Sequence, residues 1–256
     1  MNIMQHFNRT NTPNYIIYRL KGGEWAAFVN KLTKDVRLCY IDNSDLHKHS
    51  TARKISPSEY LEKYILPDEP SIVSGDFGEI LSFFAVIENY ANKGFTLIYP
   101  RKWRWKENRN KPAPGTDAVM FHITNPRKHS SEDFVVSVES KMKAVNSAEH
   151  RIQTAIDHAA KDKLSRLAKT LIWLEEKHAR HGSEEQRKIV ERFTDPATYG
   201  TFKKFHKAIA ILDSTLETSE ISKAFTNPEG VTVIVFSVED LKKAYEDTRN
   251  NVLKSI

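Results

Sequence analysis

An acidic and a basic side chain lie two residues apart within one short apolar stretch. Glu139 and Lys141 belong to Phe134–Met142, whose β-branched residues are typical of a strand. Successive side chains of a strand point to opposite faces, so Glu139 and Lys141 share one face, about 7 Å apart, and Val136 and Val138 share the other. An acid and a base on such an apolar strand indicate either an exposed ion pair or a site with a chemical task.

A second carboxylate lies at the beginning of another predicted strand, residues 115–123. Aspartate is disfavoured inside strands, so Asp117 needs a binding partner or a function; the alternative is a turn residue that bonds local backbone. A turn at Asn125-Pro126 joins this strand to that of Glu139, and a hairpin would place the two carboxylates on neighbouring strands. Carboxylates that close repel each other unless a cation lies between them, which predicts a cation site.

A third acidic residue, Glu79, lies on a predicted helix over residues 75–90. The helix carries apolar residues at helical spacing, which predicts that it packs against the sheet: Ile80, Phe83, Phe84, Ile87 and Tyr90. Glu79 is therefore a candidate for the same site. The alternative is that it caps the helix or faces water.

Residues 91–113 carry seven cationic side chains and one acid, a surplus equal to the net charge of +6 of the whole chain. Alternating tryptophan and cationic residues suit phosphate contacts combined with base stacking. The predicted nucleic-acid contacts are Arg101, Lys102, Trp103, Arg104, Trp105 and Lys106, with Lys143 at the end of the Glu139 strand. The alternative is a solvated loop whose tryptophans pack on the domain or on a partner.

The elements that would position these residues alternate between helix and strand, which predicts an α/β (mixed α+β) fold with a central mixed sheet flanked by helices. Residues 1–70 are expected to form an accessory layer, and residues 71–256 the core. The accessory layer is predicted to contain strands over 15–20 and 36–41, a short helix between them and a helix beginning at Ser56. In the core we predict strands over 95–99, 115–123, 134–142, 206–212 and 231–236, and helices over 75–90, 148–159, 164–181, 184–193 and 238–249.

The composition restricts the classes of protein. With 256 residues, 39% of them hydrophobic and 28% charged, the chain is typical of a globular protein. No apolar run is expected to reach the roughly 18–20 residues that cross a bilayer, and the first residues do not resemble a secretory signal, so we expect no membrane association. The single cysteine, Cys39, excludes an internal disulfide and a multi-cysteine zinc site, and a cytoplasmic location is expected.

The order of these acidic and basic residues along the chain resembles the PD-(D/E)xK nuclease superfamily. The pattern is a helix with Glu79, a strand with Asp117 in "GTD" (115–117), and a strand with "ESK" (139–141). The resemblance covers roughly residues 75–165. The proline of the superfamily name is not adjacent to the aspartate, because Pro114 lies three residues before it. The resemblance implies a restriction-endonuclease-like core and an active site of Glu79, Asp117, Glu139 and Lys141.

Three longer segments resemble the HamA family over essentially the full chain: "SGDFGEILSFFAVIENY", "GTDAVMFHI" and "VVSVESKMK". This resemblance implies the DNA endonuclease effector of the Hachiman anti-phage system, in a heterodimer with a helicase, HamB. Asp117, Glu139 and the carbonyl of Ser140 would bind Mg²⁺ or Mn²⁺, Glu79 would complete the site, and Lys141 would orient the attacking water. A non-catalytic module that binds nucleic acid or a partner, and cleavage of RNA by the same site, remain open alternatives.

Overall fold

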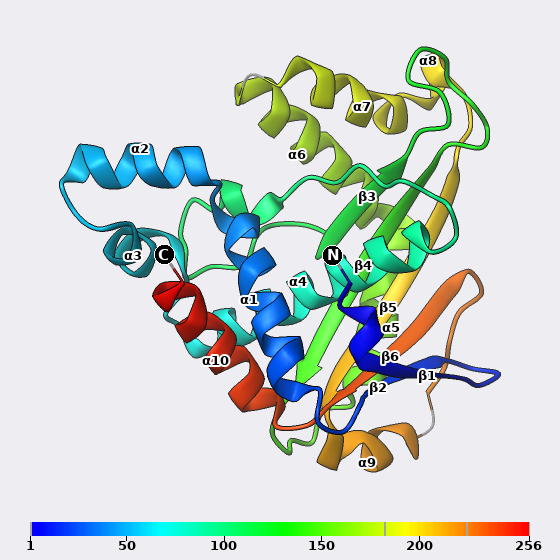
Figure 1. Ribbon diagram of the computed structural model, residues 1–256. Helices are drawn as coiled ribbons and strands as arrows, with labels where there is room; N and C mark the ends of the chain where they lie inside the picture. The colour runs from blue at the N-terminus through cyan, green and yellow to red at the C-terminus, as the bar shows by residue number, and fades with distance from the viewer. Residues whose placement is uncertain (1, 182, 224, 256) are drawn as a thin grey trace.

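The computed structural model describes residues 2–181, 183–223 and 225–255, and this part of the chain contains a six-stranded sheet (Figure 1). The strands lie in the order β1-β2-β6-β5-β4-β3. The four inner strands run parallel to one another, and β1 and β3 pair antiparallel at the two edges. Their bounds are β1 (Phe7–Asn11), β2 (Ile16–Leu20), β3 (Ala118–His122), β4 (Phe134–Lys143), β5 (Lys203–Asp213) and β6 (Val231–Val238). The predicted α/β fold with a mixed sheet is confirmed.

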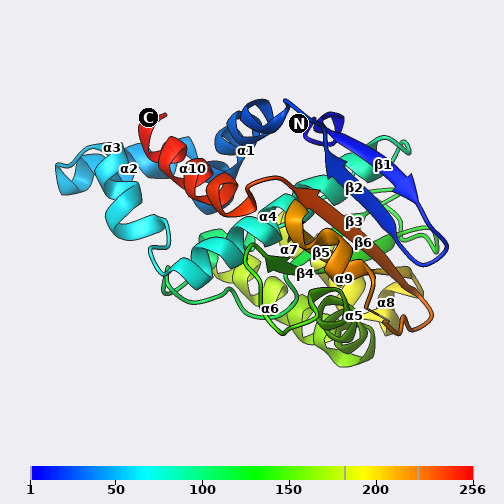
Figure 2. The same cartoon turned by 90° about the horizontal axis from the view of Figure 1, so that it is seen from below.

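Helices cover both faces of the sheet (Figure 2). One face packs against α1 (Trp25–Tyr40), α4 (Pro70–Ala91) and α10 (Leu241–Lys254); the other packs against α5 (Arg151–Lys161), α6 (Leu167–Arg180) and α7 (Glu184–Thr194). Strand β4 is apolar on both faces because both are covered: Val136 lies in the α4 cluster and Val135 in the α6 cluster. The shorter elements are η1 (Met4–His6), α2 (Asn43–Arg53), α3 (Pro57–Tyr60), η2 (Leu61–Ile65), η3 (Lys102–Trp105), η4 (Asp162–Arg166), α8 (Pro196–Tyr199), η5 (Ser214–Leu216) and α9 (Glu217–Ile221).

Helix α4 is the central helix of its layer, and it begins five residues earlier than predicted, with Pro70 in its first turn. Its 22 residues are long and apolar enough to cross a membrane, by length and composition alone. This corrects the expectation that no segment would reach that length. However, 61% of its most apolar window is buried inside the protein, as in the core helix of a globular domain.

Residues 1–70 contribute to the sheet and to the main hydrophobic core. Strand β2 pairs with β6 in the middle of the sheet order, and α1 packs against α10. The backbone N–H groups of Ile3 and Met4 donate to the carboxylate of Glu88 on α4, at 2.6 and 2.7 Å. The first 70 residues and the rest of the chain thus share a sheet and a hydrophobic core.

Three predicted elements differ in the structure. Residues 36–41 are not a strand: Val36 and Tyr40 belong to the buried face of α1, which recurs at helical spacing. Residues 95–99 are not a strand either, because only Ile98 bridges to β3. The predicted helix over 164–181 is not regular at its start: Leu164 is 83% exposed and lies in the π-helical turn η4, whose wider turn interrupts the 3.6-residue periodicity.

Candidate functional site

Asp117 lies one residue before β3, at the end of a tightly packed loop. Ala118 pairs with Val138 in the antiparallel register, so Asp117 lies next to Glu139 on the neighbouring strand. The carboxylate Oδ2 of Asp117 accepts a hydrogen bond from the backbone N–H of Ser140 at 2.8 Å. The hairpin expected from the sequence therefore brings the two carboxylates together.

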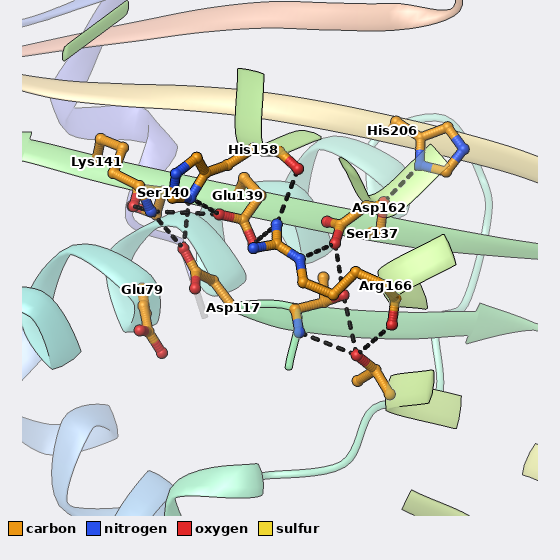
Figure 3. A network of polar contacts seen from close by, with 12 residues as sticks. Glu79, Asp117, Ser137, Glu139, Ser140, Lys141, His158, Asp162, Arg166 and His206 are labelled. Atoms are coloured by element: carbon orange, nitrogen blue, oxygen red, sulfur yellow. Dashed lines mark hydrogen bonds and ion pairs between the residues drawn. The ribbon is translucent and has the colours of Figure 1, made fainter. Parts of the chain in front are cut away.

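Glu139 and Lys141 share one face of β4, as the alternation predicts. The Lys141 ammonium lies 3.2 Å from Glu139 Oε2, 3.5 Å from Asp117 Oδ2 and 3.0 Å from the carbonyl oxygen of Ser140 (Figure 3). Three oxygens from two strands therefore converge on one positive charge. Glu139 is fully buried, whereas the Lys141 side chain keeps 19% of its surface exposed.

Glu79 enters the same site from α4. It lines one hollow of about 280 Å³ together with Asp117, Ser140 and Lys141. Helix α4 lies close to β4 at this point, since a Cβ at Gly78 would be 3.4 Å from Ser140 Oγ. The Glu79 carboxylate itself is held by Lys102, 3.3 Å away, and by the indole N–H of Trp103 at 3.2 Å. Glu79 thus borders the hollow but does not contact the Lys141 ammonium.

Two basic residues on the helical segment after β4 complete the surroundings of Glu139. The Arg166 guanidinium forms an ion pair with Glu139, and His158 Nδ1 lies 3.5 Å from Glu139 Oε2. Arg166 is held by Asp162, with Nε donating to Oδ1 at 2.6 Å. None of Arg166, Asp162 and His158 is among the residues predicted for the site. The sequence signal that could have identified Asp162 and Arg166 is their spacing of four residues, which places an acid and a base on one face of a helix.

The charged groups of the candidate site shift one another's pKa values. Burial, together with the charge of Asp117, raises the pKa of Glu139 to about 8, against the lowering effect of Lys141 and Arg166. Burial also raises the pKa of Glu79 to about 8, against the lowering effect of Lys102. Burial alone would lower the pKa of Lys141, but Asp117 and Glu139 outweigh it and the pKa is raised. Lys141 therefore carries a full positive charge at neutral pH.

The residues present fit a divalent cation with a preference for oxygen. Within residues 2–181, 183–223 and 225–255, no three His, Cys, Asp or Glu side chains are grouped as a metal site. The donors that fit are the carboxylates of Asp117 and Glu139 and the carbonyl oxygen of Ser140. These oxygens surround the Lys141 ammonium, which marks a place where positive charge is stabilised. Hard oxygen donors of this kind suit Mg²⁺ or Mn²⁺.

Much of the basic segment 101–106 is turned inward. Lys102 and Trp103 are buried against Glu79, and the Lys106 ammonium lies 2.8 Å from Asp76 with 4% of its side chain exposed. Lys143, at the end of β4, is likewise buried against Glu220 at 2.8 Å. The charges of Lys102, Lys106 and Lys143 therefore already have partners from distant parts of the sequence, and they form no exposed cationic strip; contact of these residues and Trp103 with nucleic acid stays a prediction.

The other members of the segment also bind the protein itself. Arg101 and Arg104 donate to the backbone carbonyl of Leu38, at 2.8–3.2 Å, and so attach the segment to α1. The Trp105 ring packs edge-on against Trp173 of α6. This matches the alternative in which the tryptophans pack on the domain. Contact between the segment and Glu79 comes from Lys102 and Trp103.

Gly115 makes the close packing of the Asp117 loop possible, which leads to a prediction. Its φ is +83°, and a Cβ would lie 2.5 Å from Thr170 Oγ1. Gly94 has a similar φ of +84° but open space around it, so it is a matched control. We expect Gly94→Ala to lower the free energy of unfolding by about 1 kcal/mol, and Gly115→Ala by about 1–3 kcal/mol more, measured by urea unfolding. Equal losses would contradict the role of Thr170 packing.

No curated protein matches the chain. The sequence model of the HamA family matches residues 5–252, which is nearly the whole chain and includes every residue of the hollow. The chain therefore belongs to the HamA family, which is associated with Hachiman anti-phage defence.

Proposed function

We propose that this chain is a Mg²⁺- or Mn²⁺-dependent endonuclease that cleaves DNA as the effector subunit of a cytoplasmic anti-phage complex. The observation that carries the proposal is the convergence of Asp117, Glu139 and the Ser140 carbonyl on one positively charged nitrogen. A partner helicase, HamB, would form a heterodimer with the chain and restrain cleavage until DNA is engaged; family membership supports this part.

The residues of the candidate site have separable roles. Asp117, Glu139 and the Ser140 carbonyl would hold the cation, which when bound polarises a phosphate and lowers the pKa of water. The ammonium of Lys141 donates its hydrogen bonds to the same three oxygens. Once a cation neutralises those oxygens, the donors become available to orient the attacking water and to stabilise charge that develops on the phosphate. Glu79, at the border of the hollow, would complete the site through water.

A polymeric substrate needs a path to this hollow, and the surface offers one. The hollow adjoins a larger one of about 870 Å³ between α4, the end of β4 and α10, and both are lined by Ser74, Met142 and Arg151. The cationic side chains Arg151, Lys242 and Arg249 line the larger hollow, together with the acidic residues Asp68 and Glu246. Phosphate groups are recognised by such side chains, so we propose that the cleaved strand lies here and not along residues 101–106.

The experiment that tests the proposal is metal-dependent nicking of plasmid DNA. Asp117→Asn keeps an oxygen for the Ser140 N–H but loses the charge. We expect Mg²⁺-dependent nicking that stops on chelation and falls at least about 100-fold in Asp117→Asn. Thermal stabilisation by Mn²⁺, lost in the same variant, tests the site without requiring turnover by a restrained enzyme.

Three results would redirect the proposal. Equal nicking by wild type and Asp117→Asn would remove the assigned site. Neither nicking nor stabilisation by Mn²⁺ would favour a non-catalytic module in which the carboxylates serve only as ion pairs. The proposed contacts are to phosphate and metal and not to the sugar, so a parallel assay on RNA decides between the two nucleic acids. Copurification with the helicase, and loss of nicking in the complex, tests the regulation.

A further inference from the structure

One buried carboxylate is connected to both proposed metal-binding carboxylates. We propose that Asp162 is a positioning residue that fixes Asp117 and Glu139 relative to each other, so that the two bind the cation as a preorganised pair. This inference rests on the metal site of the proposed function. It assigns a role to a residue that touches neither the cation nor the substrate, and it explains why a charge is buried at this point of η4.

The first connection runs to Asp117. Oδ1 of Asp162 accepts a hydrogen bond from the hydroxyl of Thr116 at 2.9 Å, and the backbone N–H of Thr116 donates to Thr170 Oγ1 at 3.0 Å. Thr116 is fully buried. With its side chain and its backbone both held, Thr116 fixes the backbone from which the Asp117 side chain projects.

The second connection runs to Glu139 through Arg166 (Figure 3). Asp162 Oδ1 accepts from Arg166 Nε at 2.6 Å, and Arg166 Nη2 donates to the carbonyl oxygen of His158 at 2.8 Å while it forms the ion pair with Glu139. The guanidinium is thus held at both ends. A long side chain without such contacts has many rotamers, so without Asp162 the Arg166 head group would not stay on Glu139.

The burial of Asp162 has an energetic cost. Asp162 is 2% exposed, and burying a charge costs more than filling the same space with an apolar side chain. The π-helical turn η4 spans Asp162 to Arg166 between the regular helices α5 and α6. Such turns recur at functional sites, and here the turn holds both ends of the Asp162–Arg166 ion pair that reaches Glu139. Groups that orient metal ligands in this way typically change metal affinity 10–100-fold when removed.

The test measures Mn²⁺ binding to the full chain by calorimetry, with circular dichroism to verify folding. We expect the dissociation constant to rise by about 10-fold or more in Asp162→Ala. Thr116→Val and Arg166→Gln each break one connection and should weaken binding less than Asp162→Ala. Thr116→Ser keeps the hydroxyl and should restore the wild-type affinity, which a loss of general stability would not explain.

A matched control separates positioning from burial. Asp133 is another fully buried carboxylate; it accepts from the Thr124 N–H at 2.8 Å and lies 3.7 Å from Arg192, directly before the other end of β4. Asp133→Asn should destabilise the fold and leave Mn²⁺ affinity unchanged. Wild-type affinity in Asp162→Ala, or an equal loss in Asp133→Asn, would overturn the inference. Wild-type protein that binds Mn²⁺ but cleaves no DNA would remove the nuclease proposal alone, and wild-type protein that binds no Mn²⁺ would overturn both.

Discussion

Replacing Lys141 with methionine is expected to reduce DNA cleavage by about 100-fold or more and, at the same time, to tighten Mn²⁺ binding by about tenfold. The two effects have opposite signs because the ammonium lies 3.0–3.5 Å from the three oxygens that would bind the cation. Methionine keeps most of the aliphatic stem but removes the competing positive charge. It also removes the donors that would orient water and stabilise the phosphate.

Asp117→Asn is the companion variant, since it removes a ligand and leaves Lys141 in place. It should lose Mn²⁺ affinity and cleavage together. Both variants are measured by calorimetric titration with Mn²⁺ and by plasmid nicking. The two measurements together show whether each residue is a metal ligand or a donor to water and phosphate. If Lys141→Met loses Mn²⁺ affinity as Asp117→Asn does, the ammonium does not mark the cation position, and the assignment of ligands is wrong.

The local part of the site was accessible from the sequence, because strand alternation alone places Glu139 and Lys141 on one face. The Asn125-Pro126 turn extended this to Asp117 through the hairpin register, which the structure bears out. Strand periodicity could not predict which helical residues contact Glu139. Arg166 reaches Glu139 because α5 packs against β4 and the π-helical turn η4, which ends at Arg166 and interrupts the regular helical spacing, follows α5 directly.

The basic segment shows the opposite error, in which a local pattern was overinterpreted. Residues 101–106 look like a cationic surface because their partners lie far away in the sequence. Glu79 and Asp76, on α4, meet Lys102 and Lys106 only after the chain folds. Charge counted along a sequence is thus a poor guide to charge on a surface when acidic residues are buried in a neighbouring helix. The same reasoning explains α1: the β-branched and aromatic residues of 36–41 suggested a strand, but burial against α10 and α4 selects the helix.

The unfolding free energy of the metal-free protein is expected to fall as the pH rises from 7 to 8. The pKa values of Glu79 and Glu139 are about 8 in the folded protein, against an ordinary value of 4.5. Between these values the folded protein holds protons that the unfolded chain has released, so stability is lost as the pH rises, by up to about 1.4 kcal/mol per pH unit for each group. The buried His178 and His206, with pKa values of about 4 against an ordinary 6.5, act in the opposite direction only below about pH 6.5.

Urea unfolding in the presence of a chelator, at intervals between pH 7 and 8, measures this slope. Glu139→Gln keeps the shape of the side chain without its titration and should flatten the slope, while Glu79 retains its share. Because a cation binds the ionised carboxylate, added Mn²⁺ should stabilise wild-type protein more at pH 8 than at pH 7 and should have little effect on Glu139→Gln. A stability that rises with pH in this window, or an equal slope in the variant, would show that Glu139 is ionised before the cation arrives. In that case Lys141 and Arg166 would stabilise the ionised Glu139 carboxylate without a metal ion, and metal binding would release no proton from Glu139.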